Sequence, residues 1–308
     1  MLNEGHIVVV RNGGIGDTVL LAPVLHGLRS AFPGRDILLL GWYERVCLLL
    51  GPSFATRAYR FEQPGIHTLY GTQPLLPPKT HGLFAEASLI LWYGEDQQGR
   101  LSQNLRQLCN GQVVIHSPRP VGVKHVTDHL LKALDRLGIP RPDSVPPLEV
   151  PASLPSDLQD LLSARRQAGK TVVVHPGASG PEKRVGPEVW ADVLRGLSRG
   201  RDIRAVVLSG PEEDHLAFAL CAEVRHLEPL LVHNRPLRDV AALLKSAALF
   251  MGNDSGITHL AAAVGSPTVA VFRATDPRVW APQGEHVRIV QVDDKPGTAH
   301  LILSGVHL

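Results

Sequence analysis

The chain has few cysteines and no excess of charge of one sign. Its three cysteines, Cys47, Cys109 and Cys221, lie far apart and form no Cys-x-x-Cys pair. This pattern argues against a disulfide framework or a structural zinc site and is typical of reduced thiols in a cytosol. The 31 lysines and arginines nearly balance the 29 aspartates and glutamates, for a net charge of +2. A dedicated nucleic-acid binder concentrates basic residues, so we expect no nucleic-acid partner.

Long hydrophobic runs are also absent. A bilayer-spanning helix needs roughly 18 or more apolar residues, and the best candidate, residues 37–50, is interrupted by Glu44 and Arg45. The first residues pass through Glu4 and His6 into an apolar run and lack the pattern of a secretory signal. We therefore expect a cytoplasmic protein that does not span a membrane.

The length and composition predict two globular domains. Hydrophobic residues make up 44% of the 308 residues and charged residues 19%, as in ordinary globular proteins. Domains commonly hold roughly 100–200 residues. Between residues 140 and 155 there are six prolines, too many for a helix or a central strand. We interpret this stretch as an extended linker between a domain at 1–145 and a second at 146–308, with a long surface loop as the alternative.

Short apolar runs alternate with segments of helical periodicity on both sides of this stretch. Such alternation predicts two doubly wound, Rossmann-like α/β domains with parallel sheets. Ligands bind such sheets at the carboxyl ends of the strands, so two facing domains would place the site in an interdomain cleft. The predicted strands cover residues 6–10, 36–41, 89–92, 113–115, 171–175, 203–209, 248–251 and 268–272. The predicted helices cover residues 18–32, 125–137, 187–197, 212–224, 237–246 and 256–264.

A glycine-rich loop follows the first predicted strand. Gly14 and Gly16 let the backbone approach a ligand closely, and the N-terminus of the next helix favours anions. The loop is not the dinucleotide fingerprint, because Val19 stands where a third glycine would be needed. Asp17 stands where a helix N-cap is expected, so capping is one interpretation of this residue. A general base at the mouth of a cleft is the other.

A second loop combines a strand end, small residues and basic residues. His175 and Gly177 end the strand, and Lys183 and Arg184 follow a few residues later. Such a loop suits a phosphate or diphosphate, although two solvated basic side chains on a surface loop are the alternative. Glu212 lies in the acidic stretch that opens the next predicted helix. It either complements the helix dipole or binds sugar hydroxyls.

Polar residues gather at a third strand–helix junction, residues 252–259. Asn, Asp and Ser all cap helices, which explains part of the pattern. The junction also offers backbone N–H groups to a diphosphate and leaves Asp254 to bind hydroxyls. Elsewhere, His125, Asp128 and His129 have the spacing of metal ligands on one helix face, but no further ligand has matching spacing. We interpret them as an ordinary helix face and predict no metal site.

Taken in order, these motifs resemble glycosyltransferase family 9, the bacterial heptosyltransferase family of lipopolysaccharide core assembly. The resemblance covers about residues 6–42 and 120–290. The matching pieces are Ile-Val-Val-Val-Arg at 7–11, Gly-Asp-Thr-Val-Leu at 16–20, His-Pro-Gly at 175–177, Lys-Arg at 183–184, Glu-Val-Trp-Ala at 188–191, Met-Gly-Asn-Asp-Ser-Gly at 251–256, His-Leu-Ala-Ala at 259–262 and Thr-Asp-Pro at 275–277.

The resemblance implies a GT-B fold and an inverting glycosyltransferase that needs no metal and no cofactor. The donor would be a nucleotide sugar, typically ADP-L-glycero-D-manno-heptose, bound mainly by the second domain. The acceptor would be a glycolipid, a lipopolysaccharide core or lipid A precursor, bound mainly by the first domain near Gly14 and Gly16. Contact with the inner membrane would be peripheral.

The resemblance also assigns roles by position. Asp17 would be the general base. Lys183 would offset charge on the diphosphate, Glu212 would contact the donor ribose, and Asp254 would hold sugar hydroxyls. The remaining donor-binding positions would be His175, Gly177, Ser255, Gly256 and His259. Two other functions stay open: a nucleotide-sugar epimerase of the same architecture, and a sugar-nucleotide binding protein without catalysis.

Overall fold

The computed structural model describes residues 5–122, 125–151, 153–163, 169–293 and 297–306. The chain divides into two compact units, residues 1–149 and 150–308. The division falls within the proline-rich stretch, and the described residues between 140 and 155 form no helix or strand. This agrees with the six prolines there, which remove backbone donors and fix φ.

The first unit is built on a five-stranded parallel sheet of order β3-β2-β1-β4-β5. Its strands are β1 (His6–Arg11), β2 (Ile37–Gly41), β3 (Arg57–Arg60), β4 (Ala87–Tyr93) and β5 (Gln112–His116). Its helices are α1 (Ile15–Val19), α2 (Ala22–Ala31), α3 (Tyr43–Val46), α4 (Pro78–Ala85), α5 (Arg100–Leu108) and α6 (Val126–Arg136), with short 3-10 turns η1 (Cys47–Leu49) and η2 (Ile66–Tyr70).

The second unit is built on a six-stranded parallel sheet of order β11-β10-β9-β6-β7-β8. Its strands are β6 (Lys170–His175), β7 (Ile203–Ser209), β8 (Leu230–His233), β9 (Leu249–Asn253), β10 (Thr268–Phe272) and β11 (Val287–Gln291). Its helices are α7 (Ser156–Ser163), α8 (Pro187–Ser198), α9 (Asp214–Glu223), α10 (Leu237–Ser246), α11 (Gly256–Ala263), α12 (Pro277–Trp280) and α13 (Thr298–Ser304), with 3-10 turns η3 (Pro181–Lys183) and η4 (Arg225–Leu227).

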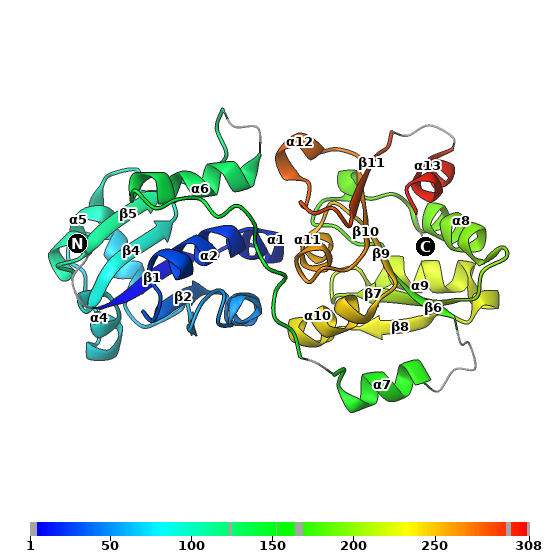
Figure 1. Cartoon of the computed structure of the whole chain (residues 1–308), viewed down its shortest axis with the longest axis horizontal. Helices are drawn as coiled ribbons and strands as arrows, with labels where there is room; N and C mark the ends of the chain where they lie inside the picture. The colour runs from blue at the N-terminus through cyan, green and yellow to red at the C-terminus, as the bar shows by residue number, and fades with distance from the viewer. Residues whose placement is uncertain (1–4, 123–124, 152, 164–168, 294–296, 307–308) are drawn as a thin grey trace. The chain divides into compact units, whose positions relative to one another are not determined.

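The central strands of both sheets are buried on both faces. β2, β4, β9 and β10 are buried along their whole length, as expected of parallel strands covered by helices on each side. In the second unit, one face of the sheet packs against α8, α9 and α13, in a core that includes Trp190 and Leu220. Figure 1 shows the helices of each unit flanking its sheet. The two parallel α/β sheets predicted from the sequence are therefore present.

The single helix predicted over 18–32 is wrong, because two helices occupy this stretch. α1 ends at Val19 and α2 starts at Ala22. Pro23 lies in the first turn of α2, where a missing N–H costs nothing. Inside one continuous helix it would remove a hydrogen bond and clash with the preceding turn. The chain therefore turns at Leu20 and Leu21 and begins a new helix.

Among the described residues, no helix is both long enough and apolar enough to cross a bilayer.

Candidate active site

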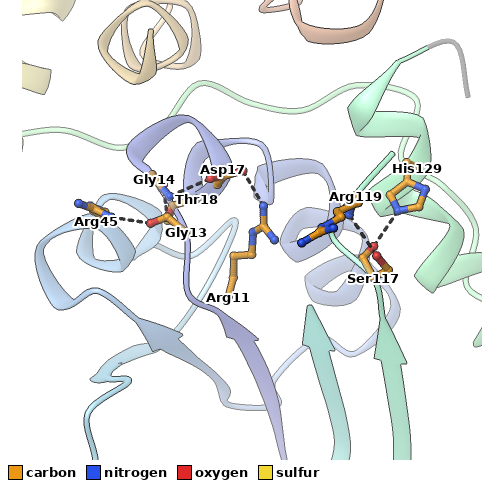
Figure 2. Close-up of polar contacts among 9 residues, drawn as sticks. All are labelled: Arg11, Gly13, Gly14, Asp17, Thr18, Arg45, Ser117, Arg119 and His129. Carbon is orange, nitrogen blue, oxygen red and sulfur yellow. Dashed lines mark hydrogen bonds and ion pairs between the residues drawn. The ribbon is translucent and has the colours of Figure 1, made fainter. Parts of the chain in front are cut away.

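Asp17 lies at the carboxyl end of β1, where two donors fix its carboxylate. Arg11 Nη2 donates to Asp17 Oδ1 at 2.6 Å, and the Gly14 backbone N–H donates to Oδ2 at 2.8 Å (Figure 2). The Arg11 side chain is 7% exposed and that of Asp17 is 41% exposed. A buried cation thus orients a carboxylate that remains open to solvent. Asp17 is the third residue of α1 and not its N-cap, but the capping interpretation holds in another form, because its carboxylate accepts from the backbone N–H of the N-cap residue Gly14.

The glycine loop is shaped around this carboxylate. A Cβ atom at Gly13 would lie 2.7 Å from the Asp17 Cβ, a distance that forces the loop to move. Arg45 Nη1 donates to the Gly13 carbonyl at 2.6 Å, while its guanidinium stacks 5.5 Å from the Trp42 ring centroid. The predicted loop residue Gly14 bonds Asp17, and Gly16 lies in the first turn of α1. The loop is therefore held from two sides.

The end of β5 places further polar residues at this edge of the sheet. Figure 2 shows Arg119 and Ser117 beyond the end of β5, in the same view as Asp17. Arg119 Nε lies 3.7 Å from Glu95 Oε1, and its side chain is 82% exposed. The His129 ring bonds the Ser117 carbonyl through Nε2 at 2.7 Å. This edge of the first sheet therefore carries the exposed carboxylates of Asp17 and Glu95 and the exposed cation of Arg119.

The His125, Asp128 and His129 set forms no metal site. The His125 ring Nδ1 accepts from the Thr127 N–H and caps α6. Asp128 forms an ion pair with Arg141. Over the part of the chain that the structure describes, no three or more His, Cys, Asp or Glu side chains cluster in a way that could hold a metal ion. The structure thus places His125 at the N-cap of α6, with Asp128 and His129 in the first turns of the helix.

His116 predicts a pH dependence of stability. Burial, reinforced by the neighbouring His129, lowers the pKa of His116 to about 4 from 6.5. At pH values between these two pKa values, His116 of the unfolded chain binds a proton that the buried ring of the native chain does not bind. Stability therefore falls as the pH drops through this window, by about 1.4 kcal/mol per pH unit at most. The measurement is the free energy of unfolding in urea as a function of pH.

The control for this prediction is a pair of variants. His116→Gln keeps a donor for the His129 carbonyl, to which Nε2 now bonds at 2.9 Å, and should reduce the slope. Part of the slope should remain, because burial also lowers the pKa of His175. His226→Gln changes an exposed histidine and should leave it as in wild type. An unchanged slope in His116→Gln would show that His116 does not set it.

In the second unit, His175 and Gly177 form the end of β6 and the loop after it. His175 is buried, and its Nδ1 bonds the Leu208 carbonyl at 3.0 Å. Burial lowers the pKa of its imidazole, so the neutral ring holds β6 to β7. A Cβ at Gly177 would lie 2.6 Å from the Glu213 Cγ. Glu213 therefore packs on this loop, whereas Glu212 is exposed in the turn before α9.

Lys183, Asp254 and Thr275 meet at one carboxylate oxygen. Lys183 Nζ donates to Asp254 Oδ2 at 2.8 Å, and Thr275 Oγ1 donates to the same oxygen at 2.6 Å. The Asp254 side chain is 6% exposed and that of Lys183 is 23% exposed. Because a lysine ammonium has three N–H donors, Lys183 keeps donors for a ligand.

Asn253, which is not among the predicted ligand residues, bonds both ends of the connection between β6 and α8. Its side-chain Nδ2 donates to the Pro176 carbonyl at 2.8 Å, and its Oδ1 accepts from the Val185 N–H at 3.1 Å. The residue is completely buried. One amide thus holds both ends of the β6–α8 connection, which carries Lys183, against the end of β9.

The remaining predicted residues lie at the start of α11. Ser255 caps this helix, with its Oγ accepting from the Thr258 N–H. Gly256 is the first helical residue, and His259 is buried one turn later. Since β6 pairs with β9 in the register His175–Gly252, these residues lie at the same sheet edge as His175. The second unit therefore gathers all its predicted residues except Glu212 around two strand ends.

A sequence model of glycosyltransferase family 9 (heptosyltransferase) matches residues 83–301. A putative glycosyltransferase of Haemophilus influenzae is 32% identical over 117 residues, which cover 37% of this chain and 34% of that protein. This chain thus aligns with about a third of that relative. Lipopolysaccharide heptosyltransferase 3 of Escherichia coli K12 is 24% identical over 88% of this chain and 83% of that protein.

A solved structure shows the same fold. ADP-heptose LPS heptosyltransferase II of Escherichia coli superimposes with a TM-score of 0.73 over 97% of each chain, at 18% identity. At this identity the likeness concerns the fold alone. It confirms the predicted GT-B class of two parallel α/β sheets.

Proposed function

This chain belongs to glycosyltransferase family 9, and from that premise we propose that it transfers heptose from ADP-heptose to a lipopolysaccharide core or lipid A precursor. The family confirms the resemblance found in the motifs, and the chain is a glycosyltransferase. The donor, the acceptor, inversion at the anomeric carbon and independence of metal ions are parts of the proposal. The names of the Escherichia coli relatives support the donor and the acceptor.

The observation that carries the proposal is the placement of Asp17. Its exposed carboxylate is fixed by Arg11 and Gly14 at the carboxyl end of a buried parallel strand, where ligands bind this class of sheet. A fixed, accessible carboxylate suits a general base, which must lie within hydrogen-bond reach of the proton it removes. We therefore assign to Asp17 the removal of the proton from the acceptor hydroxyl.

We assign binding of the nucleotide sugar to the second unit. In a single displacement, the acceptor oxygen forms a bond to the anomeric carbon while the bond from that carbon to the diphosphate oxygen breaks. The electron pair of the broken bond leaves with the diphosphate, and the hydroxyl proton passes to Asp17. The opposite face of the anomeric carbon is attacked, so the configuration inverts.

Charge on the leaving diphosphate can be stabilised by groups of this unit without a divalent cation. Lys183 keeps N–H donors beyond the one that bonds Asp254, and the start of α11 presents the first backbone N–H groups of a helix. Preorganised donors of this kind stabilise developing charge. Asp254 is assigned to sugar hydroxyls and Glu212 to the donor ribose. His175 and Gly177 shape the loop, and Ser255, Gly256 and His259 shape the helix start.

The acceptor is assigned to the first unit, near Gly14 and Gly16. The proposed location is the cytoplasm, with peripheral contact to the membrane that holds the glycolipid. No nucleic acid takes part in this proposal.

The test is a transfer assay preceded by a donor screen. Because a ligand that binds the native state raises its stability, thermal shift with ADP-, UDP-, GDP- and CDP-sugars should give the largest shift with ADP-heptose. Mass spectrometry should then show a lipid A precursor gaining one heptose, with full activity after chelation of metal ions. Isomerised donor without transfer would instead indicate an epimerase. Donor binding without turnover on any acceptor would indicate a binding protein, and strict Mg²⁺ dependence would contradict the metal-free mechanism.

A further inference from the structure

Two large aromatic side chains lie exposed directly after β2. Trp42 is 46% exposed, and Tyr43, the first residue of α3, is 42% exposed. The same short helix buries Val46 and packs against α1, β2 and β3. The fold thus fixes α3 from its inner side and leaves both rings in contact with solvent. Adjacent exposed rings, unlike single scattered ones, are typical of an interaction surface.

An arginine guanidinium covers each ring. The guanidinium carbon of Arg45 lies 5.5 Å from the Trp42 ring centroid, and that of Arg60 lies 5.1 Å from the Tyr43 ring centroid. Such cation–π contacts hold the rings in place, and the N–H groups of arginine bind phosphate oxygens in pairs. We call these four residues the aromatic–arginine surface. It combines apolar rings with cations that suit phosphate groups.

The aromatic–arginine surface borders the loop that carries Asp17. β2 and β3 end in register, with Gly41 opposite Arg60, and β1 pairs with β2 on its other side. The surface therefore lies at the carboxyl edge of the first sheet, beside the strand that Asp17 follows. Arg45 joins the two features directly, because its Nη1 donates to the Gly13 carbonyl at 2.6 Å (Figure 2).

We infer that the aromatic–arginine surface docks on the phospholipid membrane that holds the acceptor. The inference rests on the proposed function and deepens it, because a glycolipid acceptor displays its sugars at the membrane surface. Trp and Tyr rings favour the boundary between headgroups and acyl chains, and arginines bind the lipid phosphates at that depth. Docking at this edge of the sheet brings the loop of Asp17 to those sugars.

The neighbouring charges determine how the surface should bind. Glu44 lies next to Arg45 in the chain and Glu62 lies two residues after Arg60, and both glutamates are exposed. Their carboxylates offset the two guanidinium charges, so the surface carries no large net charge. Binding should therefore depend on insertion of the rings more than on the charge of the headgroups. Salt, which screens exposed charges, should change it little.

The test is flotation of the full chain with phosphatidylcholine vesicles, whose headgroups have no net charge. Wild type should float with the vesicles. Tyr43→Ser should weaken binding roughly tenfold, as expected when its ring no longer transfers from water to the membrane. Tyr43→Phe keeps the ring and should bind as wild type does. The matched control is Phe218→Ser, which removes a ring that is 57% exposed on α9 of the second unit and should not affect binding.

Tryptophan fluorescence locates the contact. Trp42 is exposed, whereas Trp92 and Trp190 are buried and Trp280 is half-buried in the other unit. Vesicles with brominated acyl chains should therefore quench the emission of Trp42. Trp42→Phe keeps a ring beneath Arg45 and should still bind, but the quenching should disappear. Quenching that persists in Trp42→Phe would place another part of the chain at the membrane and contradict the inference.

Transfer activity separates this inference from the proposed function. Tyr43→Ser should transfer heptose more slowly than wild type to an acceptor embedded in vesicles, and as fast as wild type to a deacylated, water-soluble acceptor. Absence of transfer by wild type to either acceptor would contradict the proposed function, whereas flotation and quenching would still test the surface.

Each contrary result has a distinct meaning. A wild type that does not float, or that floats no better than Tyr43→Ser, would overturn the inference. Equal loss of transfer to both acceptors would also overturn it, because Tyr43 would then support the acceptor site itself. A wild-type dimer that Tyr43→Ser abolishes, without binding to vesicles, would assign the surface to a second copy of the chain.

Discussion

Replacing Asp17 with asparagine is expected to lower kcat by about 10²–10⁴-fold, the usual contribution of a positioned general base. Asparagine has the same shape and can still accept a hydrogen bond from Arg11 or Gly14, but it cannot take the proton of the acceptor hydroxyl. Because the donor is assigned to the other unit, the affinity for ADP-heptose should stay as in wild type. The measurement is initial-rate kinetics at saturating donor and acceptor.

The matched control is Asp36→Asn. Asp36 also forms an ion pair with an arginine, with Asp36 Oδ2 3.4 Å from Arg57 Nη2, but it precedes β2 at the amino end of the sheet. Its replacement should leave kcat unchanged. Wild-type turnover by Asp17→Asn would remove Asp17 from the mechanism.

Replacing Lys183 with methionine is expected to affect both catalysis and stability. Loss of one preorganised donor to developing charge lowers kcat by about 10²–10³-fold in comparable sites. The change also leaves the buried Asp254 carboxylate with Thr275 as its remaining partner. We expect a loss of about 2 kcal/mol in the free energy of unfolding, toward the low end for a broken ion pair because Lys183 is partly exposed.

A double variant separates these two effects. Lys183→Met with Asp254→Asn removes the uncompensated charge, so most of the lost stability should return while activity stays low. Denaturant unfolding of the wild type, both single variants and the double variant gives the coupling energy of the pair. Full activity in Lys183→Met would mean that the leaving diphosphate does not depend on this side chain. Additive losses of stability would mean that the ion pair has no net coupling.

Much of the fold follows from the sequence because buried parallel strands read as continuous apolar runs. β1 and β10 are examples, and their predicted positions agree closely with the structure. β3 was missed because its sequence, Arg-Ala-Tyr-Arg, belongs to a partly exposed edge strand and has no apolar run. The predicted helix over 18–32 failed because the periodicity continues across the turn before Pro23.

The candidate site could be predicted only in part. Asp17, Lys183 and Asp254 stood out because they lie in short motifs, although their roles remain proposals. The contacts between these residues and their partners could not be predicted, since Asp254 bonds Thr275 across 21 positions and Lys183 across 71. Such pairings arise from the fold and leave no local pattern. Arg11 left one signal, a charged residue at the end of an otherwise apolar run.

The buried amide of Asn253 has a consequence for motion. Since it bonds the Pro176 carbonyl and the Val185 N–H, neither end of the β6–α8 connection can move away without breaking a buried hydrogen bond. The connection and the end of β9 should therefore open together, as one cooperative unit. Slow exchange of the Val185 amide hydrogen would then report the opening of the whole β6–α8 connection from the end of β9, rather than the fluctuation of a single turn.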